Sequence, residues 1–292
     1  MSTISGHYEI TRRAIQELAH EYPQVRDLQD FAIDPAYAPP ADDAMAQAGH
    51  FLGTTPLFDR ELIEKGLSVK ALGPGLTWFE PAGSIKVQAM CDWVAHPADG
   101  AVCQDLQDLE SGNHWNDTPD AQAAHFMRAS SDGDRGAYDA AIRQIAKNLH
   151  DAAWEMYSRR AALGAGWIPH QGRATDGSVS KHLGAAVHCV QDSFSPSHVK
   201  RASGDEEHPG AIVKIYVYKQ QEDSGLHDAL DELWRSRVRE DFSVLGRQAI
   251  NATKMLIRLA VRCSRAPVPS VADWADFKAF CAQWLAPMDG LR

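Results

Sequence analysis

The stretch HLGAAVHCVQDSFSPSH, residues 182–198, carries the strongest signal in the chain. Residues 179–193 are almost wholly apolar, which predicts a short and deeply buried helix, and Pro196 ends it. His188 and Asp192 are four residues apart, so their side chains lie one above the other on that helix. The turn at Ser195 and Pro196 then brings His198 back toward the helix end.

Two imidazoles and a carboxylate from one helix end can converge on a metal ion. The alternative is a buried histidine that forms a hydrogen bond with an aspartate, which is common for an isolated His–Asp pair. This alternative explains a third donor after a helix-ending turn less well. The spacing therefore favours a metal site at His188, Asp192 and His198.

Helical spacing of apolar residues continues on both sides of this stretch. It predicts a long helix over residues 136–162, and further helices over 7–20, 226–240, 243–263 and 271–285. Ser5 and Gly6 are predicted to cap the first of these helices. The alternating, β-branched run 212–218 predicts one strand, and 199–212 reads as a charged loop. The sequence therefore predicts a single all-α domain over residues 1–292 with a minor β element.

Composition narrows the classes of function. The formal net charge of −10 disfavours a broad basic face for nucleic acid. The five cysteines form no CxxC pair, which argues against a disulfide framework and against a thiolate zinc site. The thirteen histidines instead cluster with acids in the middle of the chain. Imidazole and carboxylate without thiolate is the ligand set of catalytic zinc sites.

The first residues lack the apolar core of a signal peptide, and no apolar run approaches the roughly 20 residues of a membrane span. We therefore expect a protein that is cytoplasmic as synthesised. Export by a signal-independent secretion system stays open.

Three further groups are candidate ligands. His227 and Asp231 are four residues apart on a predicted helix, where a hydrogen-bonded pair is the alternative to a metal site. His7 faces inward at a helix start, where a lone histidine is more often structural. The loop NHWNDTPDAQAAHFMR, residues 113–128, offers Asp117 and His125, although a solvated acidic loop would also explain its acids.

Together these residues resemble the zinc-dependent phospholipases C and the related S1/P1-type nucleases. That family has an inward N-terminal histidine, an aspartate before a histidine often followed by Phe, then His-x3-Asp-x5-His with a proline, and finally His-x3-Asp or His-x3-Glu. The matching residues here are His7, Asp117, His125, His188, Asp192, His198, His227 and Asp231. Asp108, Glu110 and Asp120 stay open as alternatives to Asp117.

The resemblance implies a multi-helix, phospholipase C-like fold that holds two or three zinc ions. Asp192 would bridge two ions, with His125 and His188 on one of them and His198, His227 and Asp231 on the other. His7 would serve a third ion. Secreted members complete that third site with an N-terminal Trp, and no Trp precedes His7 in this chain.

The implied reaction is attack on a phosphodiester by a water whose pKa zinc lowers to about 7, with Asp117 as the general base. We expect a phospholipid or a membrane surface as substrate, with Trp115, Phe126, Met127 and Phe194 as acyl-chain contacts or as core. The alternatives are an S1/P1-like nuclease on single-stranded nucleic acid, which is less favoured, and a non-enzymatic, metal-stabilised helical protein. A membrane-lytic type of enzyme without a signal peptide also suggests a secreted bacterial toxin or effector, with secretion machinery or an immunity protein as partner.

Overall fold

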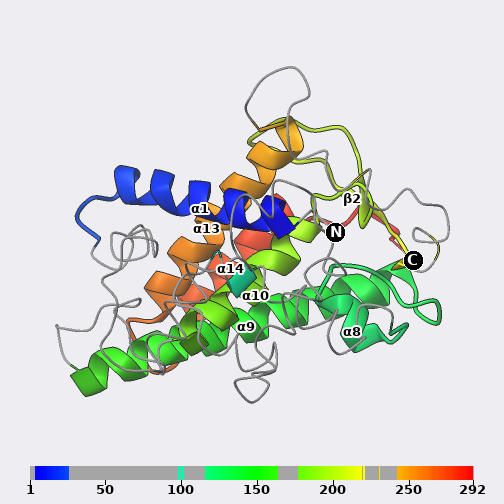
Figure 1. Cartoon of the computed structure of the whole chain (residues 1–292). Coiled ribbons are helices and arrows are strands. Elements are labelled where there is room, and N and C mark those ends of the chain that lie inside the picture. The colour runs from blue at the N-terminus through cyan, green and yellow to red at the C-terminus, as the bar shows by residue number, and fades with distance from the viewer. Residues whose placement is uncertain are drawn as a thin grey trace, which may run out of the picture.

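The computed structural model describes residues 4–25, 98, 100–101, 116–163, 177–218, 220, 230 and 242–291. The helices with described bounds are α1 (Ile4–Glu21), α8 (Pro119–Ala123), α9 (Asp134–Leu163), α10 (Gly177–Asp192), α13 (Val244–Cys263) and α14 (Val271–Trp284) (Figure 1). Strands β1 (Val199–Arg201) and β2 (Ile212–Ile215) form a two-stranded antiparallel sheet. The fold is thus mostly helical with a minor β element. The predicted helix 226–240 lies, apart from Leu230, outside the described residues.

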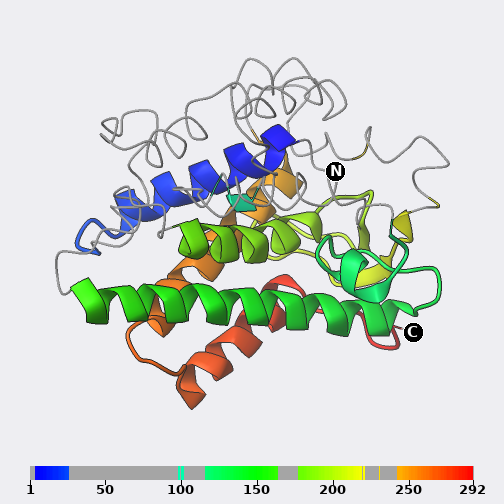
Figure 2. The ribbon, with the colours of Figure 1, turned by 60° about the horizontal axis from the view of Figure 1, so that its bottom comes forward.

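Helix α10 lies at the centre of the packing. It packs against α9 and α13, and it lies between α1 and α9 (Figure 2). Leu183, Ala186, Val187 and Val190 are fully buried on it, as its apolar sequence predicts. The helix therefore holds its last turn, with His188 and Asp192, inside the bundle.

A close backbone approach fixes one neighbour of α10. A Cβ atom at Gly184 would overlap the backbone of Gly100, so only glycine lets the two segments pack this closely. Because His188 lies one turn further along α10, the approach also brings the carbonyl of Ala101 within reach of its ring. The glycine in HLGAAVH therefore serves the site as well as the packing.

The five predicted helices that the structure describes begin and end within three residues of their predicted bounds. Ser243 caps α13 through the backbone N–H of Gly246, and Ser270 forms a capping box with Asp273 at the start of α14. The capping prediction at the first helix was wrong, since α1 begins at Ile4 and so contains Ser5 and Gly6.

The sheet differs from the prediction in two respects. The first residues of the predicted charged loop form β1, in which Val199 pairs with Ile215 and Arg201 with Ile212. The strand predicted over 212–218 ends earlier, at Ile215. The sheet follows directly on the turn after α10, so it anchors the segment that carries His198.

Candidate metal centre

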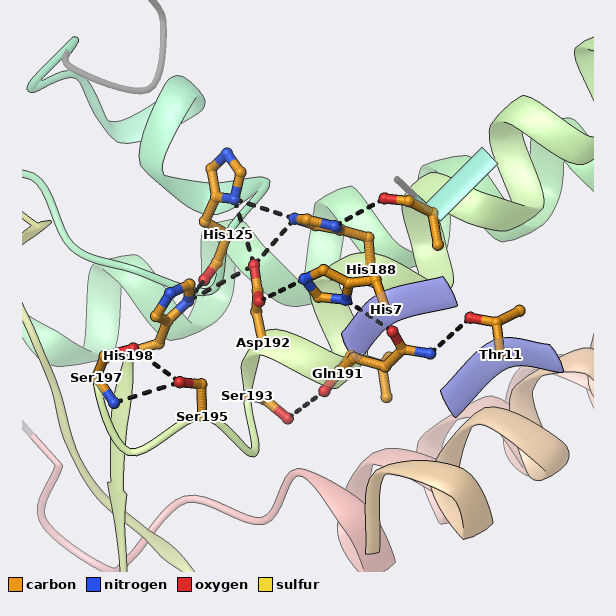
Figure 3. A network of polar contacts seen from close by, with 12 residues as sticks. His7, Thr11, His125, His188, Gln191, Asp192, Ser193, Ser195, Ser197 and His198 are labelled. Carbon is orange, nitrogen blue, oxygen red and sulfur yellow. Dashed lines mark hydrogen bonds and ion pairs between the residues drawn. The ribbon is translucent and has the colours of Figure 1, made fainter. Parts of the chain in front are cut away.

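Four histidines surround one aspartate inside the helical bundle (Figure 3). His188 and Asp192 come from α10, His198 from the turn after it, His7 from α1, and His125 from the turn after α8. The exposed fraction is 0% for His7, His188, Asp192 and His198 and 2% for His125. We call these five residues the Asp192 cluster.

The carboxylate of Asp192 is the common neighbour of all four rings. Its Oδ1 lies 3.2 Å from Nε2 of His7. Its Oδ2 lies 3.0 Å from Nε2 of His188, 3.2 Å from Nδ1 of His125 and 3.5 Å from Nδ1 of His198. Within the described part of the chain, every ion-pair partner of Asp192 is a histidine.

The orientation of His188 decides what this geometry can hold. Its Nδ1 lies 2.9 Å from the carbonyl oxygen of Ala101, and because a carbonyl only accepts, Nδ1 carries the proton. In a neutral ring Nε2 then carries no proton, and its lone pair faces two atoms. Nε2 lies 3.0 Å from Asp192 Oδ2 and 3.0 Å from His125 Nδ1. A lone pair against a carboxylate is repulsive unless a cation, either a proton or a metal ion, lies between them.

His7 is oriented in the same manner as His188, whereas in His198 the nitrogen nearest to Asp192 is the one that donates to a backbone carbonyl. Nδ1 of His198 donates to the backbone carbonyl of His125 at 2.6 Å. Nδ1 of His7 lies 2.7 Å from Oε1 of Gln191, and its ring lies 4.1 Å, between centroids, from that of His188. In metal-binding histidines the second ring nitrogen usually donates a hydrogen bond to such an acceptor, which fixes the tautomer and the orientation of the ring.

The donor set fits a metal ion. The ligand atoms of His7, His188 and Asp192 lie within 4.8 Å of one another, as a shared ion requires. Ligand atoms around a tetrahedral zinc ion are about 3.3 Å apart, because each lies about 2.0–2.1 Å from the ion. The nitrogen–oxygen separations of 3.0 and 3.2 Å at Asp192 are close to that value.

Asp192 carries the negative charge of the cluster. Burial by itself raises the pKa of a carboxyl, but the charges of His198, His188 and His7 and a hydrogen bond from His125 outweigh it. The pKa of Asp192 is therefore held well below its usual range, and the carboxylate is ionised whenever positive charge sits on its neighbours.

The turn between Asp192 and His198 is fixed by a partly buried cation. Arg201 donates from Nε to the carbonyl of Ser193 at 2.8 Å, and its guanidinium lies 4.3 Å from the ring centroid of Phe194. Burial lowers the pKa of Arg201 to about 9, which still leaves it charged at neutral pH. The hydrogen bonds and the aromatic face together offset its loss of hydration.

Backbone strain accompanies His125. The next residue, Phe126, has a φ of 50°, in the left-handed region that costs a non-glycine residue about 1–2 kcal/mol. Its ring is fully buried and packs edge-on against Tyr138. Such strain persists only where the surroundings fix it, and it is common at functional sites.

The structure brings together five of the eight predicted ligands. His7 joins the same cluster as His188, although the resemblance assigns it to a separate ion. Asp117 is exposed, and its Oδ1 accepts a hydrogen bond from the backbone N–H of Ser130 at 2.6 Å. It makes no described hydrogen bond or ion pair with the Asp192 cluster. His227 and Asp231, and the alternative acids Asp108 and Glu110, lie outside the described residues, and Asp120 is exposed on α8.

The apolar candidates for lipid contact belong to the core. Phe126, Met127 and Phe194 are almost fully buried, so they pack the bundle and are not available to an acyl chain. Trp115 lies outside the described residues. In the part of the chain that the structure describes, no helix is both long and apolar enough to cross a membrane.

The chain matches no family model, no curated protein and no solved structure. Function is therefore inferred from the Asp192 cluster and from the motifs that the sequence contains.

Proposed function

We propose that the protein is a metal-dependent phosphodiesterase whose zinc centre is built on Asp192. The observation that carries this proposal is the approach of His188 Nε2 to Asp192 Oδ2 at 3.0 Å while the other nitrogen of the ring donates to a backbone carbonyl. That geometry needs a cation, and a buried set of imidazoles and a carboxylate without thiolate suits zinc.

His7, His188 and Asp192 would hold one ion, and His125 supplies a further nitrogen beside the same carboxylate. His198 would bind through Nε2, because its Nδ1 donates to a backbone carbonyl. Imidazoles on both oxygens of Asp192 support a bridging role for it. His227 and Asp231 complete the set by resemblance. A second or third ion, and the helical phospholipase C-like fold itself, are part of the same proposal.

When bound, zinc supplies a Lewis acid that makes a coordinated water acidic near neutral pH and offsets the charge of a phosphodiester. The residues of the chain do the rest. Ala101 and Gln191 hold the rings of His188 and His7, and Asp192 supplies negative charge. We assign the general base to Asp117 by resemblance, where it would accept a proton on its carboxylate.

The substrate that we propose is a phospholipid, cleaved on the diacylglycerol side of phosphorus. The test is a panel of phosphatidylcholine, phosphatidylethanolamine, single-stranded DNA and RNA, assayed with zinc-loaded wild type and with His188→Ala. Release of a phosphorylated head group and diacylglycerol that disappears in the variant is the expected result. Cleavage of nucleic acid alone would favour the S1/P1-like nuclease, and release of free fatty acid would contradict attack at phosphorus.

A second candidate is a structural metal that stabilises the bundle without catalysis. The zero exposure of His7, His188, Asp192 and His198 favours it, because catalytic zinc keeps a position open to substrate. The two candidates differ on metal removal. If the metal is structural, its removal lowers the thermal stability, and the protein hydrolyses no substrate of the panel with or without metal. If the protein is a hydrolase, removal of the metal lowers the thermal stability and also abolishes turnover.

The biological setting that we propose is a toxin or effector that acts on membranes and is held in check by an immunity protein. Expression in the cytosol and, through an added signal peptide, in the periplasm, with and without His188→Ala, tests this proposal. Toxicity that depends on compartment and on His188 is expected. Equal harmlessness in both compartments would contradict it.

A further inference from the structure

Gln191 is a buried polar residue next to Asp192 that the sequence motifs do not include. Its side chain leaves α10 and reaches His7 and Thr11 of α1 (Figure 3). Oε1 lies 2.7 Å from Nδ1 of His7, and Nε2 donates to the hydroxyls of Thr11 on α1, at 2.8 Å, and of Thr253 on α13, at 3.1 Å. All four residues are buried.

The orientation of this amide determines the tautomer of His7. With the oxygen toward the ring, Nδ1 of His7 must carry the proton, because an amide oxygen only accepts. Nε2 then presents a lone pair at 3.2 Å from Asp192 Oδ1, as a metal ligand requires. With the amide reversed, Nδ1 would accept and Nε2 would carry the proton. His7 would then donate to Asp192, and its nitrogen would be closed to a metal ion.

We propose that Gln191 is a positioning residue that selects the metal-binding tautomer of His7, and that Thr11 and Thr253 hold its amide in the required orientation. This role rests on the proposed metal centre. The amide also connects α1, α10 and α13. The packing of these three helices therefore orients the amide and, through it, sets the tautomer of His7. Outer partners of metal-binding histidines typically change metal affinity about 10–100-fold when removed.

The experiment uses the full chain freed of metal, zinc titration in competition with a chromophoric chelator, and nitrogen NMR of the His7 ring. Gln191→Met keeps the length of the side chain and removes both polar atoms. Gln191→Glu keeps an oxygen that accepts from His7. Gln248→Met is the matched control, because Gln248 is a buried glutamine on α13 whose Nε2 donates to the carbonyl of Asp205.

Gln191→Met is expected to weaken zinc binding by about 10–100-fold and to shift His7 toward the tautomer with the proton on Nε2. Gln191→Glu is expected to bind zinc close to the wild-type level, and the control is expected to change neither measurement. If Gln191→Met fails to fold, Thr11→Val, which keeps the shape and removes one hydroxyl, is expected to show a smaller change in the same direction.

Unchanged zinc affinity in Gln191→Met, or an Nδ1 of His7 that carries no proton in the metal-free wild type, would overturn the role of Gln191 and leave the metal centre standing. A wild type that binds no zinc would overturn both. A loss of affinity equal to that of the Gln248→Met control would mean that general destabilisation, and not the tautomer, is responsible.

Discussion

Replacement of Asp192 by Asn removes the charge around which the four imidazoles gather while it keeps the size of the side chain. Asp192 is fully buried, and the separations from its oxygens to the ring nitrogens run from 3.0 to 3.5 Å. Because it is the one carboxylate of the Asp192 cluster, Asp192→Asn leaves only neutral donors within that cluster for a divalent ion. We therefore expect the variant to lose the stabilisation that zinc gives the wild type.

The size of that stabilisation follows from linkage. Free zinc at about 100 times Kd stabilises the folded chain by about 2.7 kcal/mol. In domains of about 150–250 residues, each kcal/mol raises Tm by about 2–4 °C, so zinc should raise the Tm of the wild type by about 5–11 °C. Differential scanning fluorimetry with and without added zinc measures this rise, and each protein supplies its own metal-free baseline.

Asp139→Asn is the control for Asp192→Asn. Asp139 is a half-exposed residue of α9 that pairs with Arg135, so its replacement should leave the zinc-dependent rise intact. Asp192→Asn should abolish the rise. A variant that keeps the full wild-type rise would refute the assignment of Asp192 as the central ligand.

Three further outcomes are expected. Asp117→Asn should keep the bound metal and lose about 10²–10⁴-fold in turnover if Asp117 is the general base. Unchanged turnover and metal content would mean that Asp108, Glu110 or Asp120 is the general base instead. Burial raises the pKa of Tyr138 to about 12, so the native chain keeps this proton while the unfolded chain releases it near pH 10. The free energy of unfolding should therefore fall as pH rises from about 10 to 12, and in Tyr138→Phe it should fall less over that range, as measured by urea unfolding. An equal fall in the wild type and the variant would contradict the raised pKa of Tyr138. Ser270→Ala removes the capping box of α14 and should lower the free energy of unfolding, measured in urea, by about 0.5–2 kcal/mol. An unchanged free energy of unfolding would mean that the capping box does not stabilise the protein.

Local periodicity predicts most of the described fold. The apolar spacing of 136–162 and the apolar run of 179–193 give α9 and α10 to within two residues at each end, because a helix that buries one face must repeat apolar residues at its own period. Strand β1 has no such signal. Its sequence Val199-Lys200-Arg201 is short and charged, and it becomes a strand only because β2 pairs with it.

In the site too, local spacing predicts the contacts within one helix and does not predict the contacts between distant segments. His188 and Asp192 are neighbours by helical geometry alone, so their spacing predicts their contact. His125 reaches His188 across a separation of 63 residues, and the sequence indicates this contact only through resemblance to a family pattern. Gln191 and the carbonyl of Ala101 were not predicted, because neither a lone amide on an apolar helix nor a backbone oxygen carries a sequence signal for the residue that it will contact.

Asp117 shows the limit of a motif. Its place before His125 suggests a residue at the metal, and the structure shows an exposed carboxylate bonded to the backbone N–H of Ser130. Spacing along a loop does not determine where a side chain points, since a loop has no repeating geometry. The role of Asp117 therefore depends on the kinetic test above.

The most direct test of the metal centre is the metal content of native protein purified without chelator, measured by plasma mass spectrometry for the wild type and for His188→Ala. The proposal predicts at least one zinc ion per chain, and two or three if the full ligand set is used, with a loss of at least one ion in the variant. A native wild-type protein that contains no metal would contradict it.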